Sequence, residues 1–415
     1  DSEKMVLDSF NFFIDSGLAD LNDTVWSQML NAGLAMIELN GSNNMDILLP
    51  KFEDTFERLS SHDLQLDDEV SDRVREGVIV FLGTVARNLD ATTDSDKVQK
   101  VVSNLTEVLK TPSHSVQTAA ANCLSPLMPL MTDEDERKKL VNLLVDRLAT
   151  GVTYGERKGA SFGLAGAIAG LKLSALKKYD VLQSLEDHVT NKNSSKAREG
   201  ALLAYQSLFQ ELGSKFEPYI DTILPLLLMS FSDPNTDVRE ATQEASQTVM
   251  ANLTAYGVQR ALPRVISGLE DKAWRTKLEA IGLLGSMAYC APKQLSSCLP
   301  MIVPRLLDVM ADPHQKVQDA TRGALKVIGS VIRNPEIRNL VPVLMAALND
   351  PAEHTKDALA KLMKTSFIHS VDPPSLALII PILRRGLKDR VPSTKVMAAQ
   401  ITGSICSLTS DVKDI

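Results

Sequence analysis

The chain has 415 residues, of which 44% are hydrophobic and 23% charged, and its formal net charge is −8. This is an ordinary globular composition that can bury a large core. No apolar run reaches the roughly 18 residues of a membrane-spanning helix, and no signal peptide pattern opens the chain. The first residue is Asp1, and the repeat pattern described below still runs at Ile415. We therefore expect the sequence to be part of a longer protein.

Charge is uneven along the chain. Residues 1–150 contain 26 acidic and 13 basic side chains, whereas residues 151–415 contain 26 acidic and 31 basic ones. The overall acidic balance argues against a general nucleic-acid-binding protein, but it leaves room for a local basic face on the second part.

The four cysteines are too few and too scattered for a disulfide framework or a zinc cluster. They are Cys123, Cys290, Cys298 and Cys406. We expect small core residues in a reducing compartment.

A short pattern recurs along the chain. A turn, often Asp-Pro, is followed by a β-branched or small residue, then by Arg, Lys or Gln, and then by Ala within a few positions. Thr24-Val25-Trp26 is a first, divergent copy. The basic or Gln position of the later copies, called the marker residue below, is Arg75, Gln117, Arg157, Arg198, Arg239, Arg275, Gln318, Lys356 and Lys395. The mean step between markers is 40 residues.

Each copy contains two helical patterns. After the marker Gln318, for example, apolar residues from Val317 to Val331 recur three and four positions apart, and Gly329 and Asn334-Pro335 are expected to end the helix. The other helix carries a Pro-containing apolar run such as residues 299–307, and proline is tolerated in a first helical turn. In the Asp-Pro turns at 233–234, 312–313 and 350–351, Asp is expected to cap the next helix and Pro to start it.

Two helices per forty residues cannot bury both of their faces alone, so neighbouring copies must share a core. Strand signals are weak, and the period favours HEAT repeats over shorter repeat classes. The sequence therefore predicts an all-α fold, a HEAT-repeat α-solenoid of about ten helical hairpins. It would be one continuous solenoid, with acidic repeats over 1–150 and basic repeats over 151–415.

No combination of residues predicts an enzyme. A phosphate-binding loop is absent from the sequence, and the six histidines (His62, His114, His188, His314, His354 and His369) are not spaced as metal ligands. The glycines at 163 and 166 lie inside an Ala/Gly-rich helix, which favours close helix packing over phosphate binding. The acidic run 133–136 favours a helix N-terminus over a metal site. We expect no catalytic residue, cofactor or metal.

Basic residues near the turns are the candidate binding residues. Lys172, Lys177 and Lys178 cluster near one helix–helix turn, and Lys192, Lys196 and Arg198 near the next inter-repeat turn. Equivalent turns of a solenoid stack along one edge, which would align a set of cations: Arg157, Lys158, Lys196, Arg198, Arg239, Lys272, Arg275 and Lys277. Such a line suits a phosphate backbone. The structural alternative is that a marker Arg or Lys pairs with the turn Asp of an adjacent repeat.

Trp274 precedes the marker Arg275. We expect it to fill the inter-repeat core, and stacking on a base or a partner is the alternative.

Several longer stretches resemble one pair of protein families. Residues 271–319, together with 157–166, 328–337, 368–387 and 395–409, resemble the HEAT region of fungal elongation factor three. They are even more similar to the matching region of the general control translational activator family, whose members activate the kinase of initiation factor two alpha during amino-acid starvation. The resemblance covers about residues 150–415, and the preceding acidic repeats fit only generically.

The resemblance implies a noncatalytic, cytoplasmic scaffold of the integrated stress response that binds stalled or collided ribosomes. Its partners would be ribosomal RNA and ribosomal proteins, with no membrane and no small-molecule substrate. The kinase would be bound by a region outside this chain. Two alternatives remain: the HEAT region of an elongation-factor-three-like ribosomal ATPase, and a general protein–protein scaffold.

Overall fold

The computed structural model describes residues 2–60, 67–367 and 369–408. In these ranges the chain forms helices joined by turns and contains no strand. The prediction of an all-α fold built from helical hairpins is therefore confirmed.

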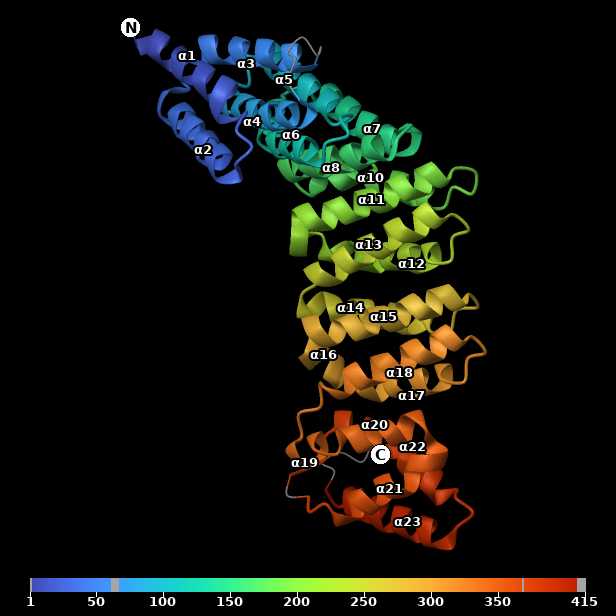
Figure 1. Ribbon diagram of the computed structural model, residues 1–415. Coiled ribbons are helices and arrows are strands. Elements are labelled where there is room, and N and C mark those ends of the chain that lie inside the picture. Colours follow the sequence, from blue (N-terminus) through green and yellow to red (C-terminus); the bar gives the residue numbers. More distant parts are fainter. Residues whose placement is uncertain (1, 61–66, 368, 409–415) are drawn as a thin grey trace. The chain divides into compact units, whose positions relative to one another are not determined.

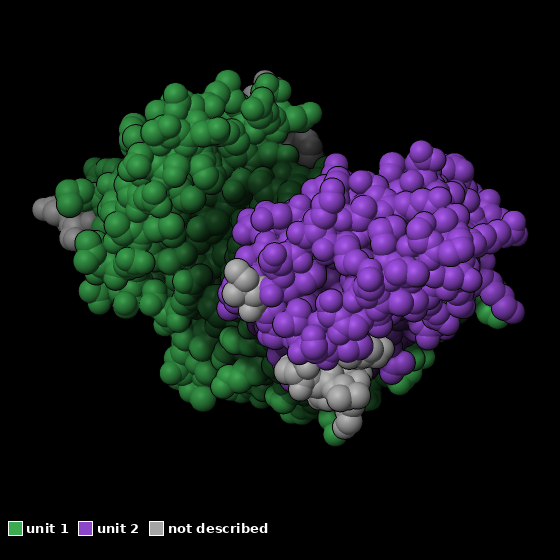
Figure 2. Space-filling view, turned by 90° about the horizontal axis from the view of Figure 1, so that it is seen from below, with its two compact units in different colours: residues 1–216 green, residues 217–415 purple. Residues whose placement is uncertain are grey.

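The chain divides into two compact units, residues 1–216 and 217–415, which Figure 2 shows in green and purple. The change of charge at residue 150 is a separate property of the sequence. It falls inside the first unit, between the helices Glu134–Thr150 and Tyr154–Leu171.

The first unit is built from two layers of helices (Figure 1). The helices that contain marker residues pack side by side in the order α4, α6, α8 and α11. Helices α3 and α10 each pack against one of them, and α5 and α7 each pack against two. The bounds are α1 Ser2–Phe12, η1 Phe13–Gly17, α2 Asp23–Asn40, α3 Met45–Ser60, α4 Asp68–Ala86, α5 Ser95–Val108, α6 His114–Leu127, η2 Met128–Leu130, α7 Glu134–Thr150, α8 Tyr154–Leu171, α9 Ser174–Lys178, α10 Val181–Val189, α11 Ser195–Leu212 and η3 Gly213–Lys215.

The second unit continues the same hairpin pattern. Helix α13 packs on α15 and α15 on α18, while α12, α14 and α17 contact them from the other layer; α20 to α23 pack on one another. The bounds are η4 Glu217–Tyr219, α12 Ile220–Ser230, α13 Thr236–Asn252, α14 Ala255–Gly268, α15 Trp274–Cys290, α16 Pro292–Ser297, α17 Leu299–Val309, α18 Gln315–Gly329, α19 Pro335–Arg338, α20 Val341–Asn349, α21 Pro351–Lys364, α22 Pro373–Leu387 and α23 Pro392–Cys406.

Close packing of α8 against α6 depends on glycine. A Cβ atom on Gly166 would lie 2.3 Å from the carbonyl oxygen of Ala121, and one on Gly170 would lie 2.1 Å from that of Ser125. Only glycine allows the two backbones to approach this closely. The prediction that this glycine-containing segment serves helix packing is confirmed.

The Asp-Pro turns behave in two ways. Asp350 caps α21 and Pro351 starts it, as expected. At the other two turns the prediction is wrong, because α13 begins at Thr236 and α18 at Gln315. There the carboxylates of Asp233 and Asp312 accept hydrogen bonds from the backbone two residues on and close a turn before the helix starts.

The cysteines were expected in the core, and this holds for Cys123, whose burial raises the pKa of its thiol to about 12. It is wrong for Cys406, which is the last residue of α23 and is exposed. Cys298 is half-buried. The side chain of Cys290 lies outside the described residues.

Candidate functional site

Six of the nine marker residues donate hydrogen bonds to carbonyl oxygens that precede their own helix in the chain. The Arg239 guanidinium donates to the carbonyl oxygens of Asp233 and Pro234, at 2.6 and 3.0 Å. Gln318 Nε2 donates to the carbonyl oxygen of Asp312 at 2.8 Å. Bonds to carbonyls ahead of the helix are also made by Arg75, Gln117, Arg157 and Arg198. Carbonyls at helix ends and in turns lack an intrahelical partner, so these markers complete the backbone hydrogen bonding.

Arg157 lies inside the interface between α8 and α11, although the sequence pattern placed it on an exposed edge. Its side chain is 7% exposed and its Nη2 lies 2.7 Å from Oε2 of Glu199, which is 6% exposed. A buried guanidinium needs such a partner because desolvation of an unpaired charge is costly. The charge of Arg157 is thus neutralised within the unit.

Two further candidates are half-buried. Lys158 Nζ donates to Oε1 of Gln206 at 2.8 Å and lies 5.4 Å from the ring centroid of Phe162. Arg198 donates to the carbonyl oxygen of Asn191 at 2.8 Å. Both side chains therefore tie elements of the first unit together.

Four of the candidate lysines in the first unit are exposed, and the described residues offer them no carboxylate within ion-pair distance. Lys192 and Lys196 lie at the start of α11, and we call them the turn lysines. Lys172 and Lys177 lie just beyond the end of α8, and we call them the helix-end lysines. In the chain, helix α10 (Val181–Val189) lies between the two pairs.

Lys178, in contrast, already has a partner. Its Nζ lies 2.7 Å from Oε1 of Glu134, which also accepts a hydrogen bond from the Tyr179 hydroxyl at 2.6 Å. Both bonds lower the pKa of the Glu134 carboxyl. The ion pair thus ties Lys178 to Glu134, the first residue of α7.

Lys172 has an unusual backbone conformation. Its φ is +70°, in the region that favours glycine, and its side chain is exposed. A non-glycine residue there carries backbone strain, which in proteins often accompanies a functional position.

In the second unit, Lys272, Arg275 and Lys277 lie at the start of α15. Lys272 and Arg275 are exposed, whereas Lys277 Nζ forms an ion pair of 2.7 Å with Oδ2 of Asp312 in the following turn. The hydrogen bond from Lys277 lowers the pKa of Asp312 below its usual range. Lys277, two residues after the marker Arg275, therefore makes the pairing with the turn Asp of the next repeat that the structural alternative had placed at the marker itself.

Trp274 does not fill the inter-repeat core, and that expectation is wrong. It is half-buried at the start of α15 and stacks on His314, with ring centroids 3.9 Å apart and an angle of 9° between the planes. The first residue of a helix lies at the rim of the repeat, so its side chain cannot reach the centre of the layer. His314 was not predicted as a neighbour, although it lies 40 residues, one repeat, after Trp274.

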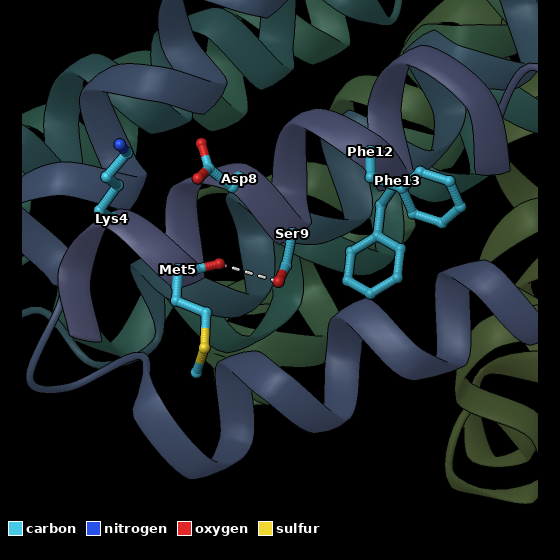
Figure 3. Close-up of a pocket in the computed structure, with 6 residues that line it drawn as sticks. All are labelled: Lys4, Met5, Asp8, Ser9, Phe12 and Phe13. Carbon is cyan, nitrogen blue, oxygen red and sulfur yellow. Dashed lines mark hydrogen bonds between the residues drawn. The ribbon is translucent and has the colours of Figure 1, made fainter. Parts of the chain in front are cut away.

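A hollow on the outward face of α1 offers no chemistry. Its lining comes from α1 and the start of η1 alone: Lys4, Met5, Asp8, Ser9, Phe12 and Phe13 (Figure 3). The Ser9 hydroxyl donates to the Met5 carbonyl oxygen at 2.8 Å, so it serves its own helix. The hydroxyl is thus turned to the backbone and not to Asp8 or Lys4, the lining groups that could act as its base.

The acidic run at 133–136 forms the start of α7, as predicted. The Asp133 carboxylate accepts hydrogen bonds from the backbone of Asp135 and Glu136. Across the described residues, no group of three or more His, Cys, Asp or Glu side chains is arranged to hold a metal ion. In the same ranges, none of the helices combines the length and apolarity needed to cross a membrane.

Three family models match the chain, and all three describe HEAT repeats. The EF3 N-terminal HEAT repeat matches residues 157–325, the HEAT repeats of the stalled ribosome sensor GCN1 match residues 2–87, and the elongation factor 3/GNC1 HEAT repeat matches residues 353–415. Together with the layered hairpins, these matches define the chain as a HEAT-repeat α-solenoid of the type found in elongation factor 3 and GCN1.

Sequence identity to curated relatives distinguishes GCN1 proteins from elongation factor 3 proteins. The chain is 48% identical to the protein ILITYHIA of Arabidopsis thaliana over 97% of its length, and 44% identical to the stalled ribosome sensor GCN1 of Homo sapiens over 98%. Elongation factor 3 of Gonapodya prolifera is 32% identical over 66% of the chain and is itself covered to 25%. The chain belongs to the GCN1 family. It spans 15% of the length of the first two relatives.

Proposed function

We propose that this chain is a noncatalytic HEAT-repeat segment that binds stalled or collided ribosomes in the cytoplasm and so supports activation of the initiation factor two alpha kinase. The kinase would be bound by a region outside this chain. Similarity to GCN1 relatives over nearly the whole chain carries the proposal, since one relative is named a stalled ribosome sensor and another an eIF-2-alpha kinase activator.

The distribution of free cations supports a ribosomal partner. The turn lysines and the helix-end lysines are exposed and lack a carboxylate partner among the described residues, so their charges are available to phosphates. Lys172 keeps a long basic side chain at a backbone position that favours glycine. Three other candidate cations contribute less to phosphate binding, because each already forms an ion pair with a carboxylate of its own unit: Arg157, Lys178 and Lys277.

Co-sedimentation with purified ribosomes over a salt series tests the proposal. One variant changes Lys192 and Lys196 to Glu, and a second changes Lys172 and Lys177 to Glu. A matched control changes Arg87 and Lys138 to Glu, which are exposed in the same unit but lie outside both pairs.

We expect binding that weakens with salt, with each lysine variant losing affinity and reducing the salt slope by about 1 per phosphate contact removed. The control should bind like the parent. Absence of binding at low salt contradicts the proposed function. Equal binding by the parent and both lysine variants contradicts the assignment of these lysines as contacts.

A further inference from the structure

An aromatic pair surrounded by cations lies at one edge of the second unit. Trp274, the first residue of α15, stacks face to face on His314, the residue that precedes α18. The guanidinium carbon of Arg275 lies 4.8 Å from the centroid of the Trp274 ring, and Lys316 Nζ lies 5.8 Å from it. We call Trp274, His314, Arg275 and Lys316 the aromatic–cation cluster.

The charges around this cluster are unbalanced. The part of the chain that the structure describes supplies no carboxylate within ion-pair distance of Arg275, Lys316 or the adjacent Lys272. The nearby acidic side chains are engaged elsewhere: Asp271 accepts a hydrogen bond from the Ala273 backbone. Asp312 accepts from Lys277 Nζ and from the His314 backbone. The cluster and the adjacent Lys272 thus offer three cations that no described anion holds in an ion pair.

Arg275 also departs from the pattern of the other Arg and Gln markers. Arg239 and Gln318, the markers on either side, are the fourth residues of their helices and donate to the carbonyls of their preceding turns, whereas Arg275 is the second residue of α15. Arg275 remains exposed and lies over the indole ring instead. Its guanidinium is therefore held at the surface by a flat aromatic support rather than used inside the repeat.

We propose that the aromatic–cation cluster binds single-stranded RNA. An unpaired nucleobase extends the Trp274–His314 stack, and Arg275, Lys316 and Lys272 contact the flanking phosphates. Aromatic stacking together with cations is how proteins bind unpaired nucleotides, and arginine held over an aromatic face adds to it. An acidic peptide would use the cations but would gain nothing from the aromatic stack.

This inference deepens the proposed function and rests on it only for the source of the RNA, which would be an unpaired ribosomal RNA segment. It adds His314 and Lys316, which the repeat pattern did not single out, and it names RNA rather than ribosomal protein as the partner of this edge.

Tryptophan fluorescence provides a direct readout of binding at the cluster, because Trp274 is one of only two tryptophans in the chain and the other, Trp26, can be replaced. Trp26→Phe in the full 415-residue chain leaves Trp274 as the only indole. This variant is titrated with a ten-nucleotide oligoadenylate, with a duplex RNA of equal length, and with an acidic peptide of equal charge. The same background then carries Arg275→Ala with Lys316→Ala, or the control Lys326→Ala, an exposed lysine on the same helix α18.

We expect the oligoadenylate to change Trp274 emission in a saturable way that weakens with salt, and the duplex and peptide to change it less. Loss of both cations should weaken binding by about tenfold or more and reduce the salt slope by about 1 to 2, as removal of phosphate contacts does. The Lys326→Ala control should bind like its parent. Circular dichroism melts confirm that the variants are folded.

Unchanged Trp274 emission with the oligoadenylate overturns the proposal, as does equal affinity of the double variant and the control. A preference for the acidic peptide overturns it in favour of a protein partner. Ribosome co-sedimentation of the same variants separates the two proposals. RNA binding without ribosome binding refutes the proposed function alone, and ribosome binding without RNA binding at the cluster refutes this inference alone.

Discussion

Replacement of Gly166 by alanine tests the packing of α8 on α6 most directly. The new methyl group would lie 2.3 Å from the carbonyl oxygen and 3.1 Å from the carbonyl carbon of Ala121. Neither atom belongs to a flexible side chain, so relief requires the two helices to separate. Because α8 also packs on α7 and α11, such a shift disturbs the centre of the first unit.

Two opposing effects set the magnitude. Overpacking of this kind costs about 1–3 kcal/mol, whereas alanine in place of glycine inside a helix contributes about 0.5–1 kcal/mol of stability. The net loss is about 1–2 kcal/mol, which corresponds to a fall in Tm of about 2–8 °C for a unit of this size. A matched control is Gly282→Ala in α15, where no atom lies within 4 Å of the added methyl group. That variant should gain about 0.5–1 kcal/mol.

Thermal melts followed by circular dichroism, with urea unfolding as a second measure, compare the two variants with the parent chain. The expected result is a lower melting transition for Gly166→Ala and an unchanged or higher one for Gly282→Ala. If Gly166→Ala melts at or above the parent temperature, α6 and α8 are not in backbone contact at Ala121, and the reasoning is refuted.

Three further predictions concern charged and strained residues. Glu199→Ala should destabilise the chain by about 3–5 kcal/mol in urea unfolding, because it leaves the Arg157 guanidinium buried without its partner; a loss below about 1 kcal/mol contradicts the buried pair. Lys277 lowers the pKa of Asp312, so the stability that the folded carboxylate contributes is complete above the usual Asp pKa of about 4 and is lost as pH falls below it. The Tm difference between the parent and Asp312→Asn should therefore shrink in acid, and a constant difference from pH 3 to 7 argues against the pair. Lys172→Gly should raise the Tm by relieving the φ of +70°, with a gain of about 1 kcal/mol, while weakening ribosome binding; a lower Tm contradicts the strain.

The repeat and its helices could be predicted from the sequence because both are local properties. Helical periodicity and turn residues lie within each forty-residue copy, and all nine marker residues do lie in helices of the structure. Helix starts were less predictable. Asp350 caps a helix while Asp233 and Asp312 close turns ahead of one, because the same carboxylate can serve either hydrogen-bonding pattern.

Partners of the charged side chains could not be predicted in the same way. Arg157 and Lys196 both stand near the start of a helix and both looked like surface cations, yet Arg157 is buried against Glu199, 42 residues away, while Lys196 is exposed. The burial of the Trp274 side chain could not be predicted either. It depends on the position of His314 in the next inter-repeat turn, which the repeat pattern does not specify.

The sequence alone determined the all-α class, the forty-residue period, the absence of a recognisable catalytic motif and the resemblance to one family of HEAT proteins. Those features follow from local periodicity and from residue identity. The packing of the helices, in contrast, sets which cations are free, which carbonyls the markers satisfy, and that Trp274 stacks on His314. These depend on how one repeat packs on the next, and burial and charge pairing across that contact are set by distances between residues about forty positions apart in the chain.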